Sequence, residues 1–311
     1  MKPKLITILI LLPIIALCLY AFIPNNSETK NILIAKGTSK SEIAQILAKE
    51  QIISAPPLYW LLEQIMTINH VLQAGEYAIP AGVSPYSIIA MMRRGDVVIH
   101  KITIPEGFTT HQVLAAINND QGLLGQVRTQ YLEGSFLPST YFYTLGDSKQ
   151  QMLDKIQQSL RDAVIQLWPT RTNQTLTQQQ MLVLASIVEK ETRFDDERPL
   201  VAAVFYNRLK KGMRLQADPT TIYAITMGKY ILERPLSKKD LQIPSPFNTY
   251  TSSGLPPTPI ANPGIESIKA VLNPAVVDYL YFVANSEGKH SFSASLAEHN
   301  RNVQSYRLRS Q

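Results

Sequence analysis

The segment 177–221 limits the possible folds of this chain more than any other part, because it combines a buried helix with charged residues. Thr177 and Gln180 form a capping-box pattern that starts a helix, and the apolar run 181–188 follows at once. A helix that is apolar on most of its faces is expected to be buried. The run ends in Glu-Lys-Glu, so two carboxylates are predicted at the end of a buried helix.

Helical spacing separates these two carboxylates. Residues three and four apart share a helix face, so Glu191 lies over Ile187 and Val188. Glu189 lies on another face, where it can pair with Arg193. An apolar wall disfavours ionisation and raises the pKa of a carboxyl toward the range of a general acid. We therefore predict Glu191 as the acid and Glu189 as a supporting residue; two solvated glutamates at a fraying helix end are the alternative.

A second helix is predicted after Asp195 or Asp196, with Pro199 in its first turn and Gly212 past its end. The stretch 214–221, RLQADPTT, is then expected to be a polar loop beside the acid. A loop of this composition is typical of a polar-substrate site, although a plain turn would have the same residues.

Several ordered blocks resemble one family, the endolytic murein transglycosylases of bacteria, or YceG-like proteins. The blocks are ASIVEKET (185–192), YNRL (206–209), GMRLQADPT (212–220), NTYTSSGLPPTPIANPG (248–264), YLYFVA (279–284) and HSF…EHN (290–300). They cover about residues 176–306. The resemblance implies that the Glu of KET, Glu191, is the catalytic residue, which agrees with the helix-face argument.

The resemblance also implies the chemistry. In lytic transglycosylases one Glu protonates the bridging oxygen of the MurNAc-GlcNAc β-1,4 bond and then takes the proton of the C6 hydroxyl of the same muramic acid. The sugar closes on itself, which is favoured because both reacting groups are in one molecule, and a 1,6-anhydro end results. No cofactor is needed. By this resemblance, the protein is expected to cut nascent peptidoglycan, to limit glycan strand elongation and to work beside synthases of the penicillin-binding type.

Residues 5–23 form an apolar run without a charged side chain, preceded by Lys2 and Lys4. Its 19 residues, at about 1.5 Å each, are about enough to cross the hydrocarbon layer of a membrane. No small-x-small cleavage site follows, which favours an uncleaved transmembrane signal anchor over a secretory signal peptide. The lysines predict a cytoplasmic N-terminus, a single pass of the inner membrane and a body in the periplasm.

The only cysteine, Cys18, lies within this run. The exported part would therefore carry no thiol, which is compatible with an oxidising compartment and excludes disulfides there. Cysteine-based catalysis and thiolate metal sites are excluded for the same reason.

Three stretches before the catalytic region share the pattern of a strand, a glycine, a Ser or Thr and a helix. They are residues 34–47, 79–92 and 104–117, with glycines at 37, 82 and 107 and cap residues Ser39, Ser84 and Thr109. These units resemble the LysM-like module of the family, and a plain packing unit without glycan binding is the alternative.

The remaining signals predict an α+β fold in four parts. The proline-rich segment 244–263 contains interspersed aromatic residues and is expected to be a rigid loop. Two strands joined by a Ser-Glu-Gly turn and a closing helix from Ser295 follow. The predicted parts are a transmembrane anchor (1–24), a LysM-like module (25–99), a second strand–helix unit with a helical connector (100–173) and a catalytic domain (174–311).

Further polar residues in the family-like blocks are candidates for substrate binding or for a network that supports Glu191, and each could equally be a structural turn residue. They are Gln216, Asp218, Thr220, Asn248, Tyr250, His290, Glu298 and Asn300. The spacing of His290, Glu298, His299 and Asn300 matches no zinc signature, so no metal is predicted.

Two other functions share parts of this pattern. A hydrolytic muramidase would need a second carboxylate to activate water, and Asp218 is the candidate. A non-catalytic wall-binding scaffold would need only the anchor and the repeated units. The net charge of +6 suits an anionic surface such as a membrane or wall polymer, and no basic run with interleaved aromatics indicates nucleic acid.

Overall fold

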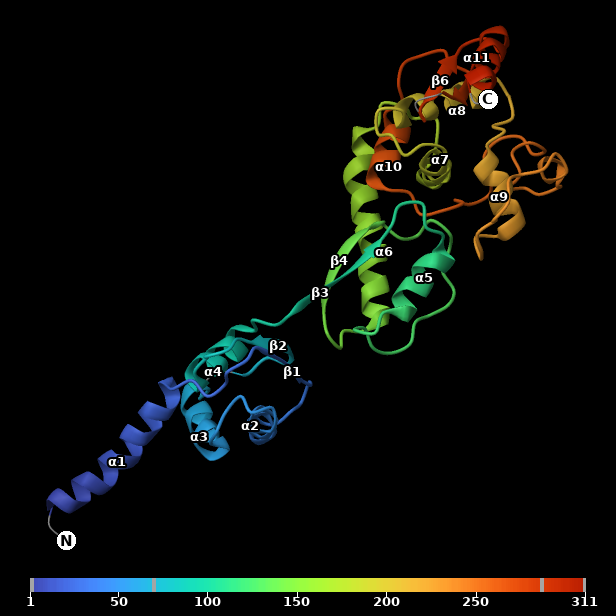
Figure 1. Cartoon of the computed structure of the whole chain (residues 1–311). Coiled ribbons are helices and arrows are strands. Elements are labelled where there is room, and N and C mark those ends of the chain that lie inside the picture. Colours follow the sequence, from blue (N-terminus) through green and yellow to red (C-terminus); the bar gives the residue numbers. More distant parts are fainter. Residues whose placement is uncertain (1–2, 69–70, 286–287, 310–311) are drawn as a thin grey trace. The chain divides into compact units, whose positions relative to one another are not determined.

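The structure is a computed structural model that describes residues 3–68, 71–285 and 288–309. Helices and three two-stranded sheets make it a mixed α+β protein, as predicted (Figure 1). The chain divides into two compact units. The first is Met1–Lys101 with Gly122–Leu124 and Phe142–Asp147, and the second is Ile102–Gln121, Gly125–Tyr141 and Ser148–Gln311.

The first unit is built around strands β1 (Lys30–Ile34) and β2 (Gly75–Ile79), which pair antiparallel with Ile32 opposite Tyr77. Helices α2 (Lys40–Lys49), α3 (Pro56–Met66) and α4 (Pro85–Arg94) complete it. Alternate strand residues face one way, and the inward set is buried against the helices. Along the chain these elements follow in the order strand, helix, helix, strand, helix.

Helix α1 (Pro3–Phe22) covers most of the apolar N-terminal run. Within the described residues, no helix is both long and apolar enough to cross a membrane. The structure therefore does not support the predicted transmembrane helix.

All three predicted strand–helix units are present, because their signals are local. A glycine with positive φ ends each turn after the strand, and a hydroxyl side chain accepts a hydrogen bond from the first turn of each helix. The glycines are Gly37, Gly82 and Gly107, and the caps are Ser39, Ser84 and Thr109.

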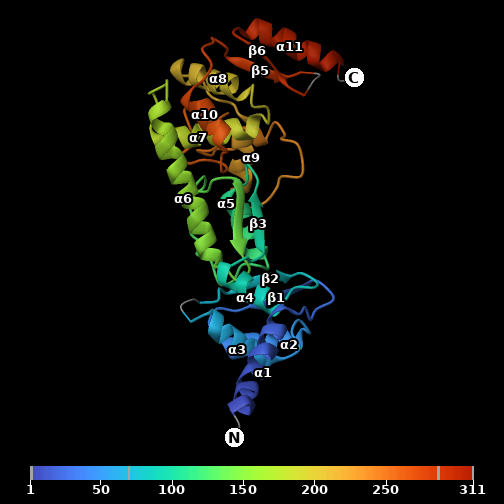
Figure 2. The ribbon, with the colours of Figure 1, turned by 90° about the vertical axis from the view of Figure 1, so that its left-hand side faces the viewer.

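The second unit carries the blocks that resemble the family. The elements that lie wholly within it are α5 (Thr110–Asn119), α6 (Lys149–Leu167), α7 (Gln178–Glu191), α8 (Arg198–Lys210), α9 (Asp218–Thr226), α10 (Ile265–Leu272), β5 (Tyr281–Ala284), β6 (His290–Ser293) and α11 (Leu296–Arg309). Strands β3 (Ile99–Ile104) and β4 (Ser139–Thr144) pair with each other, and their residues 99–101 and 142–144 belong to the first unit. Short 3₁₀ turns occupy Trp168–Thr170 and Asp240–Gln242. Figure 2 shows α11 lying along the β5–β6 pair.

Helix α7 lies at the centre of this unit. It starts with the predicted capping box of Thr177 and Gln180, and its residues 183–188 are all buried. Helices α8, α9 and α10 pack around it, and Figure 1 shows it nearly along its axis. Burial on several faces explains why the sequence 181–188 is apolar almost throughout.

Three features differ from the sequence-based expectations or lie outside them. The stretch 214–221 is not one loop, because helix α9 begins at Asp218 with Pro219 in its first turn. Strand β4 and helix α10 were not predicted. The predicted Ser-Glu-Gly turn between β5 and β6 falls on residues 286–288, of which 286 and 287 lie outside the described part of the chain.

Candidate active site

Helix α7 ends at Glu191, and the carboxyl of this residue lines a cavity of about 240 Å³. Thr192 leaves the helix in an extended conformation, with φ −141° and ψ 141°. The cavity collects residues from α7, α8, α9, the proline-rich loop and the β5–β6 pair. Its lining is Glu191, Arg208, Leu215, Gln216, Asp218, Tyr250, Phe282, Val283, Ala284 and His290.

The environment of Glu191 favours its protonated form. Burial raises the pKa of its carboxyl to about 8, the charge of Asp218 acts in the same direction, and the Arg208 guanidinium opposes both. Among the described residues, none forms a hydrogen bond or ion pair with this carboxyl. Glu191 is therefore a carboxylic acid that faces a cavity and holds its proton near neutral pH.

Glu189, two residues earlier, has a different environment. Its side chain is only 5% exposed, and Arg198 Nη2 donates to its Oε1 at 3.2 Å. The backbone N–H of Gly264 donates to its Oε2 at 2.8 Å. The predicted partner Arg193 is wrong, because Arg198 at the start of α8 is brought against Glu189 by the packing of the two helices.

Arg198 joins several elements around Glu189. Its Nε donates to Ser267 on α10 at 3.0 Å, and its other nitrogens reach Asp195 and Glu106. The guanidinium is only 5% exposed. A buried cation with this many acceptors holds the ends of α7, α8 and α10 together.

Glu106 was not among the predicted site residues. It lines a second cavity of about 350 Å³ to which Glu191 and His290 also contribute. Burial raises the pKa of the Glu106 carboxyl, and the charge of Glu189 adds to this effect. The sequence contained a signal that could have identified Glu106. The residue before the turn glycine is acidic in the third repeated unit, whereas it is Lys36 in the first and Ala81 in the second.

Arg208 was also missed as a site residue, although it belongs to the YNRL block. Its Nε donates to the Leu280 carbonyl at 2.6 Å and its Nη1 to the Leu215 carbonyl at 2.7 Å. The guanidinium lies 5.4 Å from the ring of Tyr281. Burial lowers its pKa. It supplies a fixed positive charge to the cavity of Glu191.

Three of the predicted polar residues meet on the opposite wall of this cavity. The Tyr250 hydroxyl donates to Asp218 Oδ1 at 2.6 Å, and burial followed by this contact raises the pKa of Tyr250. Gln216 precedes them with φ 49°, a left-handed conformation that is strained for a residue with a side chain. Gln216 and Asp218 are exposed and available to a ligand.

Thr220 and Asn248, also predicted, are completely buried. The Thr220 hydroxyl donates to the Ala217 carbonyl at 2.6 Å and contacts the Thr249 hydroxyl at 2.8 Å. Asn248 accepts a hydrogen bond from Thr221 at 2.8 Å and its amide nitrogen donates to two backbone carbonyls. Both side chains connect α9 to the proline-rich loop and do not face the cavity.

His290 lines both cavities and is held by Glu197. Its ring Nδ1 lies 2.8 Å from Glu197 Oε2, and its backbone N–H donates to Oε1 at 2.6 Å. Burial alone would raise the pKa of Glu197, but hydrogen bonds from His290 and Thr192 outweigh it and lower this pKa. The buried Glu197 therefore fixes the orientation of His290 beside Glu191.

Other proteins are similar to this chain in sequence and in fold. Residues 32–305 match the YceG-like family. This chain belongs to the YceG-like family. The endolytic murein transglycosylase of Bacillus subtilis (strain 168) is 32% identical over 314 residues, which cover 91% of this chain and 86% of that protein. That of Streptococcus pneumoniae serotype 2 is 26% identical over 325 residues, 90% of this chain and 58% of that protein. The family predicted from the sequence is thereby confirmed.

A solved structure agrees with the YceG-like assignment. The 2.6 Å crystal structure of a YceG-like protein from Listeria monocytogenes superposes with a TM-score of 0.56 at 32% identity. The match covers 88% of this chain and 99% of that chain.

Two further predicted residues of this YceG-like chain lie outside the cavity of Glu191, in addition to Glu189, Thr220 and Asn248. Glu298 and Asn300 are both on α11, and neither lines the cavity described above. Within the described residues, no group of three or more acidic, His or Cys side chains is placed to hold a metal ion.

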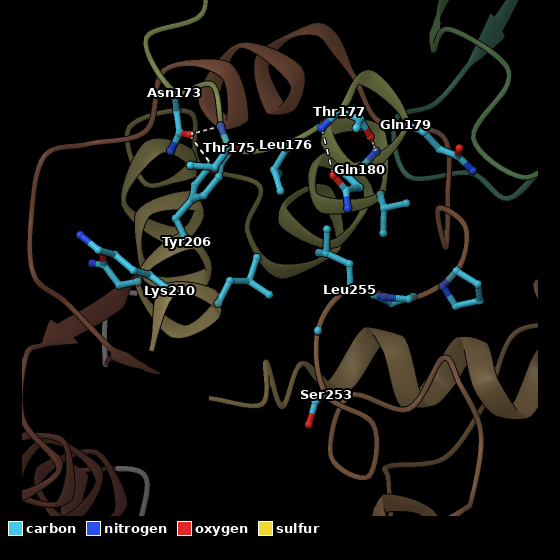
Figure 3. Close-up of a pocket in the computed structure, with 16 residues that line it drawn as sticks. Asn173, Thr175, Leu176, Thr177, Gln179, Gln180, Tyr206, Lys210, Ser253 and Leu255 are labelled. Atoms are coloured by element: carbon cyan, nitrogen blue, oxygen red, sulfur yellow. Dashed lines mark hydrogen bonds between the residues drawn. The ribbon is translucent and has the colours of Figure 1, made fainter. Parts of the chain in front are cut away.

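A larger cavity of about 1040 Å³ lies at the opposite end of α7 from Glu191. The start of α7, the last turns of α8 and the loop 253–257 enclose it (Figure 3). No residue of the Glu191 cavity contributes to its lining.

Proposed function

We propose that this protein is an endolytic murein transglycosylase that cleaves the MurNAc-GlcNAc β-1,4 bond of peptidoglycan and leaves 1,6-anhydro-MurNAc ends. The observation that carries the proposal is the Glu191 carboxyl, which faces a cavity without an ion-pair partner among the described residues and whose pKa is raised to about 8. Family membership and the names of the B. subtilis and S. pneumoniae relatives support the class of enzyme, a lytic transglycosylase acting on murein.

Glu191 would carry both proton transfers. As an acid it donates its proton to the bridging oxygen while the bond from that oxygen to C1 of muramic acid breaks. As a carboxylate it then accepts the proton of the C6 hydroxyl, whose oxygen attacks C1. The enzyme regains its proton and no water is consumed. An acid with a pKa near the working pH is suited to both steps, and proton transfer of this kind contributes about 10²- to 10⁴-fold to a rate.

The other residues of the cavity would set the protonation of Glu191 and position the glycan. The charge of Asp218 raises the pKa of Glu191, and Tyr250 holds Asp218 in place. Gln216 and Asp218 are exposed and could contact a sugar. Thr220 and Asn248 are buried and would support the cavity wall from inside the protein. His290, fixed by Glu197, would complete the wall on the other side. For Glu298 and Asn300 no contact with this cavity supports a role.

A hydrolytic muramidase is the second candidate. Asp218 lines the same cavity as Glu191, which would allow it to activate a water molecule against the same bond. The two reactions differ in product, because hydrolysis adds one water and leaves a reducing end. Product mass therefore decides between them.

We further propose that the apolar residues 5–23 attach the protein to the inner membrane, with the N-terminus in the cytoplasm and the body of the protein in the periplasm. The sequence supports this placement through the length of the run and the lysines before it. Extraction of bacterial membranes with sodium carbonate is the test: an anchored chain stays in the pellet, and release to the supernatant refutes the anchor. Action beside a peptidoglycan synthase of the penicillin-binding type is part of the same proposal.

Mass spectrometry of purified peptidoglycan digested by the protein tests the reaction. Wild-type protein is expected to release anhydro-muramic fragments, and Glu191→Gln none. Glu189→Gln is the matched control on the same helix turn, since it removes a carboxylate that does not line the cavity of about 240 Å³ around Glu191 and Asp218. Reducing-end products from wild type would establish the muramidase instead, and activity in Glu191→Gln would exclude this residue as the acid.

A further inference from the structure

The cavity at the start of α7 differs in chemistry from that of Glu191. None of its described lining residues is acidic, and Lys210 is its one charged side chain. Carboxamides and apolar groups make up much of the remaining lining. The carboxamides are Asn173, Gln179, Gln180 and Asn207, and the apolar groups are Leu176, Val183, Leu209, Leu255, Pro256 and Pro257.

The size and enclosure of this cavity suit a ligand larger than a single sugar. A volume of about 1040 Å³ is at the upper end of ordinary small-ligand sites. Figure 3 shows Tyr206 and Lys210 on one side, Gln179 and Gln180 on the other, and Leu255 on the loop that crosses between them. The walls come from three separate chain segments, so the cavity is a product of the tertiary fold.

Lys210 gives this cavity a preference for negative charge. The side chain is exposed at the end of α8, and its ammonium group makes no hydrogen bond or ion pair with the described residues. With no carboxylate in the lining to neutralise it, a carboxylate on a ligand would be its natural partner.

Carboxamides beside prolines and leucines suit a peptide better than a glycan. An extended peptide offers alternating N–H and C=O groups, which carboxamides can pair with, and small apolar side chains, which the proline and leucine surfaces can cover. The sugars of a murein glycan offer hydroxyls and one acetamido group each, and carboxylates are the strongest acceptors for the hydroxyls. The carboxylates of Glu191 and Asp218 line the other cavity, whereas none of the described residues that line this cavity carries a carboxylate.

We propose that this cavity binds the acidic stem peptide carried by the murein strand, with Lys210 pairing with a peptide carboxylate. The inference deepens the proposed function and rests on it, because it assumes that murein is the substrate. The positions of the two cavities at opposite ends of α7 would let one strand place a peptide at the first cavity and a glycosidic bond at Glu191. Glu191 is eleven positions after Gln180, a rise of about 16.5 Å along the helix at 1.5 Å per residue.

Calorimetry on the purified full-length protein tests the peptide site directly. The probe is muramyl dipeptide (N-acetylmuramyl-L-alanyl-D-isoglutamine), which has one peptide carboxylate. Saturable binding is expected, weakened about fivefold by Lys210→Ala, the effect of a charge pair worth about 1 kcal/mol. Lys211→Ala removes the neighbouring charge, which does not line the cavity, and should bind like wild type.

Three results would overturn the inference: no saturable binding, equal weakening by Lys210→Ala and Lys211→Ala, or equally tight binding of tri-N-acetylchitotriose, an uncharged sugar chain without a peptide. The last result would identify a glycan site.

A turnover measurement separates this inference from the proposed function. Wild type should cleave strands that keep their stem peptides faster than strands stripped by an amidase. This preference should fall about fivefold in Lys210→Ala and persist in Lys211→Ala. If wild type cleaves neither substrate, the proposed function fails, and the calorimetry still decides whether the cavity binds the peptide. If wild type cleaves both equally, the peptide site has no part in catalysis and the inference is refuted.

Discussion

The two sides of the last turn of α7 show how one helix holds two carboxylates in different states. Glu189 is buried and fully engaged by Arg198 and the Gly264 backbone. Glu191 faces a cavity, has no such partner among the described residues and has a pKa raised to about 8. An opposite charge in contact stabilises a carboxylate, whereas burial beside another carboxylate destabilises it.

This difference in environment predicts a structural role for Glu189 and a reactive role for Glu191. Loss of Glu189 would leave Arg198 as a buried cation with weaker acceptors, which is costly to the fold. Loss of Glu191 would remove a group that the fold accommodates poorly when ionised. The two substitutions should therefore have opposite effects on activity and stability.

The largest expected effect is on turnover by Glu191→Gln. The amide keeps the shape of the side chain but cannot donate or accept the reacting proton, so the rate of anhydro-product formation should fall by about 10³-fold or more. At pH 8 the variant should unfold at a temperature equal to or above that of wild type, since it removes a carboxyl whose ionised form is disfavoured. Mass spectrometry and thermal melts provide the two readings, and a variant that is both inactive and unfolded would not support a reactive role.

The second effect is on stability, from Glu189→Gln. Removing one partner of a buried ion pair costs about 3 kcal/mol, and the melting temperature of a unit of this size should fall by about 6–12 °C. Turnover at a temperature where the variant is folded should stay within about threefold of wild type. The double variant with Arg198→Met should be less destabilised than the sum of the singles, as a double-mutant cycle in urea would show. Strict additivity would mean that the pair is not coupled.

The sequence predicted the parts of this comparison that depend on local signals. Capping boxes, turn glycines and the apolar run 181–188 located α7 and the three strand–helix units, because each signal acts within a few residues. Helical spacing separated Glu189 from Glu191 for the same reason. Helix α9 was missed since its first residues, 218–221, are polar like a loop, even though Pro219 in its first turn is itself a helix-start signal.

Contacts between segments that are distant in the chain could not be predicted from the sequence. The predicted partner of Glu189 was the residue four positions on, Arg193, whereas the actual partner Arg198 comes from the next helix. Glu106, which follows β3, and Arg208 on α8 reach the two cavities only because segments far apart in the sequence pack together. Thr220 and Asn248 were plausible ligand residues by type, but burial removes them from the cavity surface.

The third effect is on pH dependence. The pKa of Glu191 is raised from the ordinary 4.5 to about 8, so the folded state holds a proton that the unfolded chain releases between these values. The stability from this proton is complete below about pH 4.5 and is lost as the pH rises to about 8, with a slope of up to about 1.4 kcal/mol per unit. The free energy of unfolding is measured by urea titration for wild type and Glu191→Gln at several pH values, and the difference between the two isolates this contribution. A difference that does not change with pH would contradict the raised pKa.

Turnover should follow the same group. Activity should fall on the alkaline side with an apparent pKa near 8, because the first step needs the protonated acid. Asp218→Asn removes a charge that raises this pKa, so the alkaline limb should move to lower pH by about half a unit to one unit. A muramidase that used Asp218 as its base would instead lose most of its activity in Asp218→Asn at every pH.

The smallest effects come from one hydroxyl on each side of α7, and they compare the two environments most directly. Tyr250→Phe removes the 2.6 Å hydrogen bond to Asp218 on the Glu191 side, and Ser267→Ala removes the 3.0 Å bond from Arg198 on the Glu189 side. Each bond is worth about 1 kcal/mol. Because Asp218 is exposed and Ser267 is buried, Tyr250→Phe should change turnover by about two- to fivefold with little change in stability. Ser267→Ala should lower the free energy of unfolding by about 1 kcal/mol and leave turnover unchanged. If both variants changed the same quantity, the two sides of the helix would form one network, and the division between a structural and a reactive carboxylate would be wrong.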